Sequence, residues 1–169
     1  LAVALAPSRF LSLTTLAIAH PGRLYRETWF KLPSQAVKSW YMGFFQLYGL
    51  ADWVIRANDF AFIDLLYIHW SPGWELDGAE RAAIKETLRL PGVLRAALGY
   101  YREIPWLFSS DSLAARRLYA APIQVPTLAL SGILDGCMDT RLHERLMLDI
   151  DFPAGLQVEQ LPGCGHFLH

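Results

Sequence analysis

An aspartate and a histidine near the C-terminal end of the sequence have the residue types and surroundings needed for acid–base chemistry. Asp135 lies in Ser-Gly-Ile-Leu-Asp-Gly-Cys, and His166 lies in Pro-Gly-Cys-Gly-His-Phe. A carboxylate that accepts a hydrogen bond from an imidazole holds one tautomer of the ring, so that the other ring nitrogen can act as a general base. Each residue alone also has an ordinary explanation, as a helix cap or as a surface histidine. Their order and spacing favour the joint catalytic interpretation.

Three apolar runs predict the elements that position this pair. Residues 10–18 form a nearly continuous apolar and β-branched run, and two shorter runs span 127–130 and 156–161. Such runs are typical of parallel strands that are covered on both faces. Asp135 and His166 follow the second and the third run, and active sites of parallel sheets lie at the carboxyl ends of the strands. We therefore expect the two side chains to face each other at that edge.

A helix is expected between the last two strands, over residues 140–150. Leu142, Leu146 and Ile150 recur there every four residues and predict one apolar face. Asp139 is the rival to the acid named above, but it stands where this helix needs an N-cap. We assign Asp139 that structural role.

The stretch from residue 22 to 120 has a different character. It contains aromatic clusters, several Pro-Gly breaks and no convincing strand, and it is too long to be a loop. Asp77 and Glu80 match the capping box that starts a helix. The next helix, predicted over residues 93–104, carries Tyr101 on its apolar face. We interpret the stretch as a mostly helical insertion.

Composition narrows the classes of partner. The chain has 169 residues, 53% of them hydrophobic, which is enough for one sizeable core. Its formal charge is −1 and its basic residues are scattered, so neither nucleic acid nor an anionic membrane is indicated as a partner. Charged residues interrupt the apolar runs well before the roughly 20 residues that a membrane-spanning helix needs. A small, neutral partner fits this composition better.

The cysteines and the other histidines give weaker indications. With two cysteines the chain has no disulfide framework, which favours a reducing compartment and hence a cytoplasmic location. Cys137 and Cys164 flank the acid and the base, and a disulfide between them would need Cα atoms within about 7 Å; we expect reduced thiols. His69, His143 and His169 show no spacing with acids or cysteines that indicates a metal site.

The order of these features resembles the α/β-hydrolase superfamily. Its last two core strands with their acid and base match Gly132, Asp135, Gly163, Gly165, His166 and Phe167. The family order is nucleophile, acid and histidine, and its helical cap is inserted before the acid-bearing strand. The resemblance implies an α/β protein with the α/β-hydrolase fold, of which this chain carries the C-terminal half of the parallel sheet and the inserted helical cap. It implies a core strand with the end of a flanking helix at 1–21, the cap at 22–120, and the C-terminal core strands with the acid and base at 121–169.

Two segments of the predicted cap resemble epoxide hydrolases more narrowly. The segment Trp-Tyr-Met-Gly-Phe-Phe-Gln at 40–46 is similar to the one that supplies a tyrosine to the epoxide oxygen, and the match falls on Tyr41. Leu-Gly-Tyr-Tyr-Arg at 98–102 is similar to the one that supplies the second, which falls on Tyr101. Opening an oxirane leaves an alkoxide, and two neutral phenols can donate hydrogen bonds to it. Aromatic packing is the ordinary explanation for both residues, and Tyr100 could replace its neighbour.

The resemblance also implies a mechanism that needs no metal or organic cofactor. An aspartate upstream of this chain would attack the epoxide and form an alkyl-enzyme ester, which a water activated by the histidine would hydrolyse to a diol. The wall of the substrate pocket is expected to include His20, Trp40, Phe45 and Phe167.

Three alternatives remain open. A dehalogenase shares the aspartate nucleophile, although the fluoroacetate dehalogenases carry a His where this chain has Ser39. A serine esterase would differ at the nucleophile elbow, Gly-x-(Ser/Asp)-x-Gly, which has no match in the sequence and is expected before Leu1. A non-catalytic fragment would need the missing N-terminal half, as a separate partner, or would pair as a tight homodimer.

Overall fold

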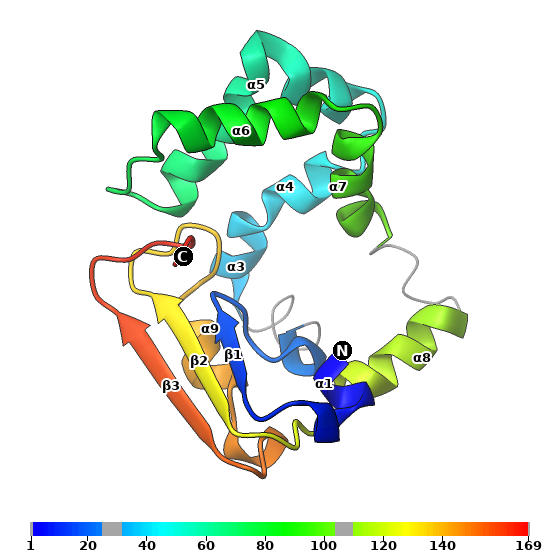
Figure 1. Ribbon diagram of the computed structural model, residues 1–169, viewed down its shortest axis with the longest axis vertical. Coiled ribbons are helices and arrows are strands. Elements are labelled where there is room, and N and C mark those ends of the chain that lie inside the picture. Colours follow the sequence, from blue (N-terminus) through cyan, green and yellow to red (C-terminus); the bar gives the residue numbers. More distant parts are fainter. Residues whose placement is uncertain (1, 25–31, 104–109, 169) are drawn as a thin grey trace.

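The computed structural model describes residues 2–24, 32–103 and 110–168, and it contains a parallel three-stranded sheet (Figure 1). The strands are β1 (Leu13–Leu16), β2 (Thr127–Gly132) and β3 (Leu156–Leu161), in the order β1-β2-β3. Leu13 pairs with Thr127, and Thr127 pairs with Leu156 on its other side. The three apolar runs therefore form strands as the sequence predicts. Because all three run parallel, the loops that follow β2 and β3 emerge at the same edge.

The first strand is shorter than the predicted run of residues 10–18. The ladder begins where the Leu13 N–H donates to the Pro126 carbonyl, at 2.9 Å. It ends at Ala17, whose φ of 53° leaves the extended region. Leu11, before the ladder, is 96% exposed. The apolar composition of the run therefore identified the strand but not its ends.

The helix between β2 and β3 is also shorter than predicted. Helix α9 spans Arg141–Leu146, and Met147 is extended and ends it. Leu142 and Leu146 are fully buried and pack in the core. The prediction for Ile150 is wrong: it lies in a separate 3₁₀ turn, η3 (Asp149–Asp151), and is 76% exposed.

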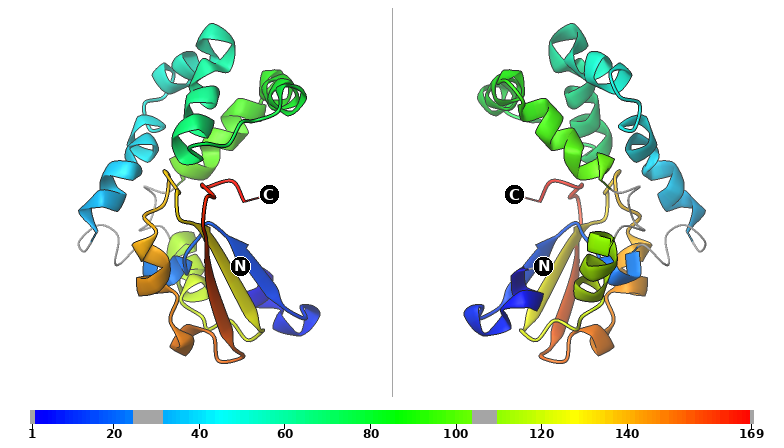
Figure 2. Two further views of the ribbon diagram at one scale, coloured as in Figure 1. Left: turned by 90° about the vertical axis from the view of Figure 1, so that its left-hand side faces the viewer. Right: turned by 90° about the vertical axis from the view of Figure 1, so that its right-hand side faces the viewer.

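Helices make up most of the described chain between β1 and β2. They are α3 (Pro33–Lys38), α4 (Trp40–Phe44), α5 (Leu50–Trp70), α6 (Gly78–Arg89), α7 (Val93–Arg102) and α8 (Ser110–Tyr119), while α1 (Ala2–Leu5) and η1 (Pro7–Arg9) precede β1. Helices α4 to α7 lie beyond the carboxyl ends of the strands (Figures 1 and 2). Helix α8 lies beside α1, at the level of the sheet. The 22–120 boundaries of the cap remain a prediction.

Local signals explain how α6 and α7 begin and end. The Asp77 side chain accepts hydrogen bonds from the N–H groups of Ala79 and Glu80, at 2.8 and 3.3 Å, so the predicted helix start is confirmed. Gly92 has a φ of 83° and separates α6 from α7. Helix α7 ends at Arg102; residue 104, the predicted end, lies outside the described residues.

One hydrophobic core connects the sheet with the helices beyond it. From the sheet side it contains Ala129, Leu142, Leu146 and Phe152. From α4 and the residue after it, α5 and α7 it contains Tyr41, Phe45, Ile55, Leu94 and Leu98. Burial of this apolar surface holds α4, α5 and α7 over the strand ends. Among the described residues, no helix combines the length and the apolar character that crossing a membrane requires.

Candidate active site

The structure brings Asp135 and His166 together at the carboxyl edge of the sheet. Asp135 Oδ2 lies 2.9 Å from His166 Nδ1, which donates the hydrogen bond. The other carboxylate oxygen, Oδ1, accepts from the N–H groups of Cys137 and Met138, each at 2.7 Å. The Asp135 side chain is 1% exposed. The predicted meeting of the two side chains is thus found, while their catalytic role remains a prediction.

Close backbone contact between the two loops produces this meeting. The Leu134 N–H donates to the Cys164 carbonyl at 2.8 Å. A Cβ atom on Gly132 would lie 2.1 Å from the carbonyl oxygen of Gly165. Only glycine permits this approach, because a side chain at that point would force the loops apart.

The C-terminal end of α5 inserts between the same two loops. The Trp70 carbonyl accepts hydrogen bonds from the N–H groups of Gly136 and His166, at 3.0 and 2.8 Å. The Ser71 hydroxyl accepts from the Phe167 N–H at 2.9 Å. A Cβ on Gly136 would lie 1.8 Å from the His69 carbonyl oxygen. The helical region therefore helps to fix both the acid and the base.

The imidazole is held in a form that favours positive charge. Burial lowers the pKa of His166, but its hydrogen bonds with Asp135 and Cys137 outweigh burial and raise the pKa to about 9. Because Nδ1–H donates its hydrogen bond to Asp135, Nε2 is the nitrogen that can accept a proton from water. The pair thus has the arrangement of an acid-oriented general base.

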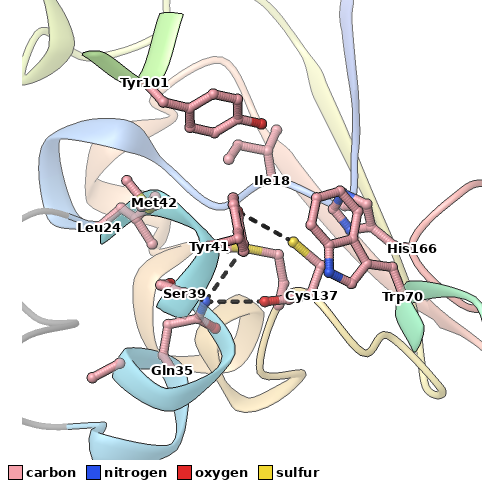
Figure 3. A pocket seen from close by; sticks show the side chains of 13 residues that line it. Ile18, Leu24, Gln35, Ser39, Tyr41, Met42, Trp70, Tyr101, Cys137 and His166 are labelled. Atoms are coloured by element: carbon pink, nitrogen blue, oxygen red, sulfur yellow. Dashed lines mark hydrogen bonds between the residues drawn. The ribbon is translucent and has the colours of Figure 1, made fainter. Parts of the chain in front are cut away.

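Both predicted tyrosines line the cavity that adjoins His166 (Figure 3). The cavity measures about 280 Å³ and is lined by Ala17, Ile18, Leu24, Gln35, Ala36, Ser39, Tyr41, Met42, Trp70, Tyr101, Cys137, Met138 and His166. Tyr41 comes from α4 and Tyr101 from α7, and their ring centroids are 5.7 Å apart. Tyr100 is 84% exposed and does not line the cavity. Of the two neighbouring tyrosines, Tyr101 and not Tyr100 therefore lies at the cavity.

The two phenols are neutral hydrogen-bond donors over the whole physiological range. Burial, followed by the neighbouring Cys137, raises the pKa of both Tyr41 and Tyr101 above the ordinary value of 10. Tyr41 Oη lies 3.5 Å from Cys137 Sγ. Neutral donors at one cavity wall can stabilise an oxyanion that develops between them.

None of the four side chains expected to line the pocket is among the residues that line this cavity. Trp40 is 54% exposed and contacts Phe44 and Phe62 instead. Phe45 is buried behind Tyr101.

The remaining two, His20 and Phe167, pack against other aromatic rings. His20 lines a second cavity of about 350 Å³ with Phe152. Phe167 stacks on Tyr67, with ring centroids 4.3 Å apart. These aromatic contacts depend on the tertiary arrangement, so the sequence pattern did not indicate them.

The cavity has lining residues that sequence reasoning missed. Met42 follows Tyr41 directly, and Cys137 and Met138 follow the acid within three residues, so proximity to the predicted site could have found them. Trp70 ends α5 and carries no motif that points to the site. Its ring lies 5.4 Å from the His166 ring and 4.9 Å from the Tyr41 ring, between the base and the phenol.

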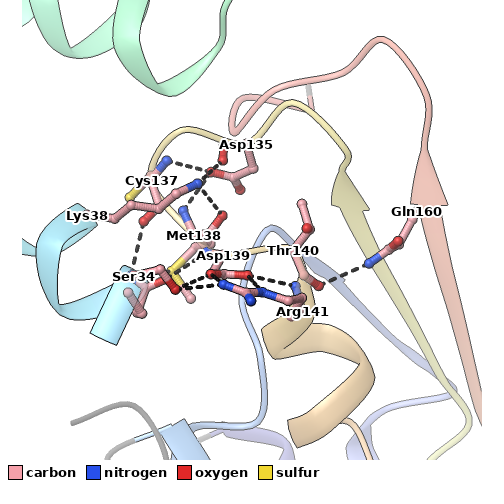
Figure 4. Close-up of polar contacts among 10 residues, drawn as sticks. Ser34, Lys38, Asp135, Cys137, Met138, Asp139, Thr140, Arg141 and Gln160 are labelled. Atoms are coloured by element: carbon pink, nitrogen blue, oxygen red, sulfur yellow. Dashed lines mark hydrogen bonds and ion pairs between the residues drawn. The ribbon is translucent and has the colours of Figure 1, made fainter. Parts of the chain in front are cut away.

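Asp139 is engaged in structural contacts (Figure 4), but the N-cap position predicted for it belongs to Thr140. Its carboxylate accepts from the Arg141 N–H at 3.1 Å, from the Arg141 guanidinium and from the Ser34 hydroxyl. The Arg141 hydrogen bond holds the pKa of this carboxyl well below its usual range. The residue directly before α9 is Thr140, so Asp139 satisfies the first helical N–H from one position further away.

Neither the two cysteines nor the remaining potential metal ligands form a disulfide or a metal site in the described part of the chain. Cys137 and Cys164 are free thiols. No cluster of three His, Cys, Asp or Glu side chains among the described residues could hold a metal ion.

Comparison with known proteins identifies the fold. The haloalkane dehalogenase DbeA of Bradyrhizobium elkanii superimposes with a TM-score of 0.68 at 18% identity, over 99% of this chain and 57% of that chain. An epoxide hydrolase of Bacillus megaterium superimposes with a TM-score of 0.69 at 20% identity, over 97% and 57%. The chain therefore has the α/β-hydrolase fold, and it spans the part that contains the last strands and the helical insertion.

Sequence comparison points in the same direction. Epoxide hydrolase 4 of Homo sapiens is 27% identical over 143 residues, which cover 82% of this chain and 37% of that protein. No protein-family model matches the sequence. The chain is thus similar to epoxide hydrolases and spans a little over a third of the length of this curated relative.

Proposed function

We propose that this chain supplies the acid, the base and two oxyanion-stabilising phenols of a hydrolase that opens an epoxide to a diol. The observation that carries the proposal is one apolar cavity into which Tyr41, Tyr101 and His166 all face, with Asp135 behind the histidine. Similarity to human Epoxide hydrolase 4 supports the same activity.

The proposed reaction has two chemical steps. In the first, an aspartate carboxylate from a segment that precedes these residues attacks an epoxide carbon, the carbon–oxygen bond breaks, and an alkyl ester forms. Tyr41 and Tyr101 donate hydrogen bonds to the leaving oxygen, and one phenol protonates it. In the second, His166 Nε2 takes a proton from water as the hydroxide attacks the ester carbonyl, and the tetrahedral intermediate collapses with cleavage of the ester carbon–oxygen bond. The expelled alkoxide takes the proton of the new carboxyl group and leaves as the diol, and the histidinium returns its proton to the phenolate. The two phenols are neutral donors, and the Nε2 atom of His166 can accept a proton because its Nδ1–H is bonded to Asp135.

The cavity wall indicates the class of substrate. Apart from the tyrosines and the histidine, the wall is formed largely by alanine, leucine, isoleucine, methionine and tryptophan side chains. Such a wall binds apolar groups by burial and offers few polar contacts for selection. At about 280 Å³ the cavity fits a small apolar epoxide, such as an aryl or short alkyl oxirane.

An open strand edge supports the proposal that a further part of the sheet joins this chain. Among the described residues, β1 pairs with β2 alone, so its other edge offers unpaired backbone groups. Leu16, the last residue of this strand, and Ile18, two residues further on, are each 43% exposed. We expect this edge to bind an N-terminal half that carries the nucleophile, rather than remain exposed.

Dehalogenation is the second candidate, because a haloalkane dehalogenase shares the fold. Two neutral phenols favour a leaving oxygen, which needs a proton, over a leaving halide, which does not. Whether the protein is instead a serine esterase depends on the identity of the nucleophile. The substrate panel described below distinguishes this activity from the other two.

A substrate panel tests the proposed function. The chain is assayed alone and together with its preceding segment, against styrene oxide, a 1-haloalkane and a p-nitrophenyl ester. We expect diol formation from styrene oxide only when the preceding segment is present. Ester hydrolysis or halide release without diol formation would refute the proposal.

A further inference from the structure

The loop that carries the acid, residues 135–139, is held from one side by helix α3. Gln35 on this helix is 1% exposed although its side chain is polar. Its Nε2 donates to the Cys137 carbonyl at 3.1 Å (Figure 3), and its Oε1 accepts from the Asp139 N–H at 2.6 Å. One buried side chain thus satisfies both a donor and an acceptor of this loop.

Two neighbours of Gln35 on α3 bind the same loop (Figure 4). The Lys38 ammonium donates to the carbonyl oxygens of Asp135 and Met138, at 2.5 and 3.2 Å. The Ser34 hydroxyl donates to the Asp139 carboxylate at 2.5 Å. The loop therefore depends on α3 for several of its polar contacts.

The contact of Gln35 with Cys137 bears directly on the acid. The Cys137 carbonyl and the Met138 N–H belong to one peptide group, which is planar and rigid. The carbonyl of this group accepts from Gln35, and its N–H donates to Asp135 Oδ1. The tilt of that peptide plane therefore sets where the carboxylate lies, and the carboxylate in turn receives His166 Nδ1.

We propose that Gln35 is a positioning residue for the Asp135–His166 pair, acting through the Cys137–Met138 peptide group. The amide side chain donates to the Cys137 carbonyl and accepts from the Asp139 N–H. It introduces no charge beside the Asp135 carboxylate. Only the kinetic consequence of this inference rests on the proposed function.

The variant Gln35→Met tests the inference, because methionine keeps the length and volume but has no amide. We expect the low-field proton resonance of His166 Nδ1–H to weaken or disappear, and the pKa of His166 to fall by about one unit or more as its bond to Asp135 loosens. In the protein with its preceding segment, kcat falls by about 10- to 100-fold and KM changes less than twofold. The matched control is Gln157→Met, the same change at an exposed position on β3.

Two outcomes separate positioning from plain packing. Lower thermal stability of Gln35→Met with an unchanged His166 resonance and pKa would overturn the inference, whatever the activity. Altered His166 signals in a protein that forms no diol even without the substitution would support the inference and count against the proposed function alone. If Gln35→Met does not fold, Gln35→Asn carries the same expectations, because it keeps an amide but withdraws it by one methylene.

Discussion

The replacement Asp135→Asn changes the charge of the acid while keeping its size. The Asn oxygen can still accept from the N–H groups of Cys137 and Met138, so its NH₂ turns toward His166 Nδ1. An NH₂ group cannot accept the Nδ1 proton, so the ring must carry its proton on Nε2, the nitrogen that the proposed mechanism needs as base. We expect kcat for diol formation to fall by about 10⁴-fold, as in other triads in which Asn replaces the aspartate.

The structure also gives the size of the electrostatic effect. The pKa of His166 is about 9, against an ordinary value of 6.5, and the difference corresponds to about 3 kcal/mol of favourable interaction with the charged ring. Asp135 is a main cause of the increase, and burial opposes it. In Asp135→Asn we therefore expect a His166 pKa near or below 6.5, measured by an NMR titration of the imidazole.

The sign of the pH dependence follows from a pKa that is higher in the folded than in the unfolded state. The stabilisation by the charged ring is fully present below pH 6.5 and is lost as pH rises through about 9. Between about pH 6 and pH 10, urea unfolding should show a loss of about 3 kcal/mol that Asp135→Asn lacks. Because the base must be neutral, kcat should rise with pH up to about 9. A His166 pKa near 6.5 in the unsubstituted protein, or equal pH profiles of the two proteins, would refute the reasoning.

Two further predictions concern the phenols and the loop contact with α5. Tyr41→Phe and Tyr101→Phe should each lower kcat for diol formation by about 10²-fold or more, because each removes an oxyanion donor. Tyr100→Phe, at an exposed position, should change kcat less than about twofold. Equal effects of all three substitutions would contradict the assignment. Gly136→Ala should lower the free energy of unfolding by about 1–3 kcal/mol, because the new Cβ meets a backbone carbonyl. Gly43→Ala, where nothing lies within 4 Å, should leave stability unchanged or raise it by up to about 1 kcal/mol, and chemical denaturation of both variants checks the difference.

The features that the sequence predicts well are those that depend on short-range patterns. Asp135 and His166 each follow a buried strand, and parallel pairing alone is enough to bring the two strand ends to one edge. The start of α6 at Asp77 likewise depends on a side chain bonding to N–H groups two and three residues away. Local chemistry of this kind is readable without knowledge of the tertiary structure.

The features that the sequence does not predict depend on contacts between distant segments. Trp70 reaches the site because the end of α5 inserts between two loops that lie more than 60 residues later in the chain. Ile150 has the spacing of an apolar helical face, but the chain leaves the helix at Met147, so its side chain points into solvent. Phe167 is adjacent to the base in the sequence, and its ring stacks on Tyr67 of α5, a contact with a residue 100 positions earlier in the chain.

Trapping of the covalent intermediate tests the central claim most directly. In His166→Gln, with the preceding segment present, the base is lost but the first step is intact, so intact-protein mass spectrometry should show a stable gain of one epoxide mass on an aspartate in that segment. Adding Tyr41→Phe and Tyr101→Phe should abolish the gain, because ring opening then lacks its oxyanion donors. No adduct in His166→Gln, or an adduct that forms equally well without the two phenols, would contradict the account.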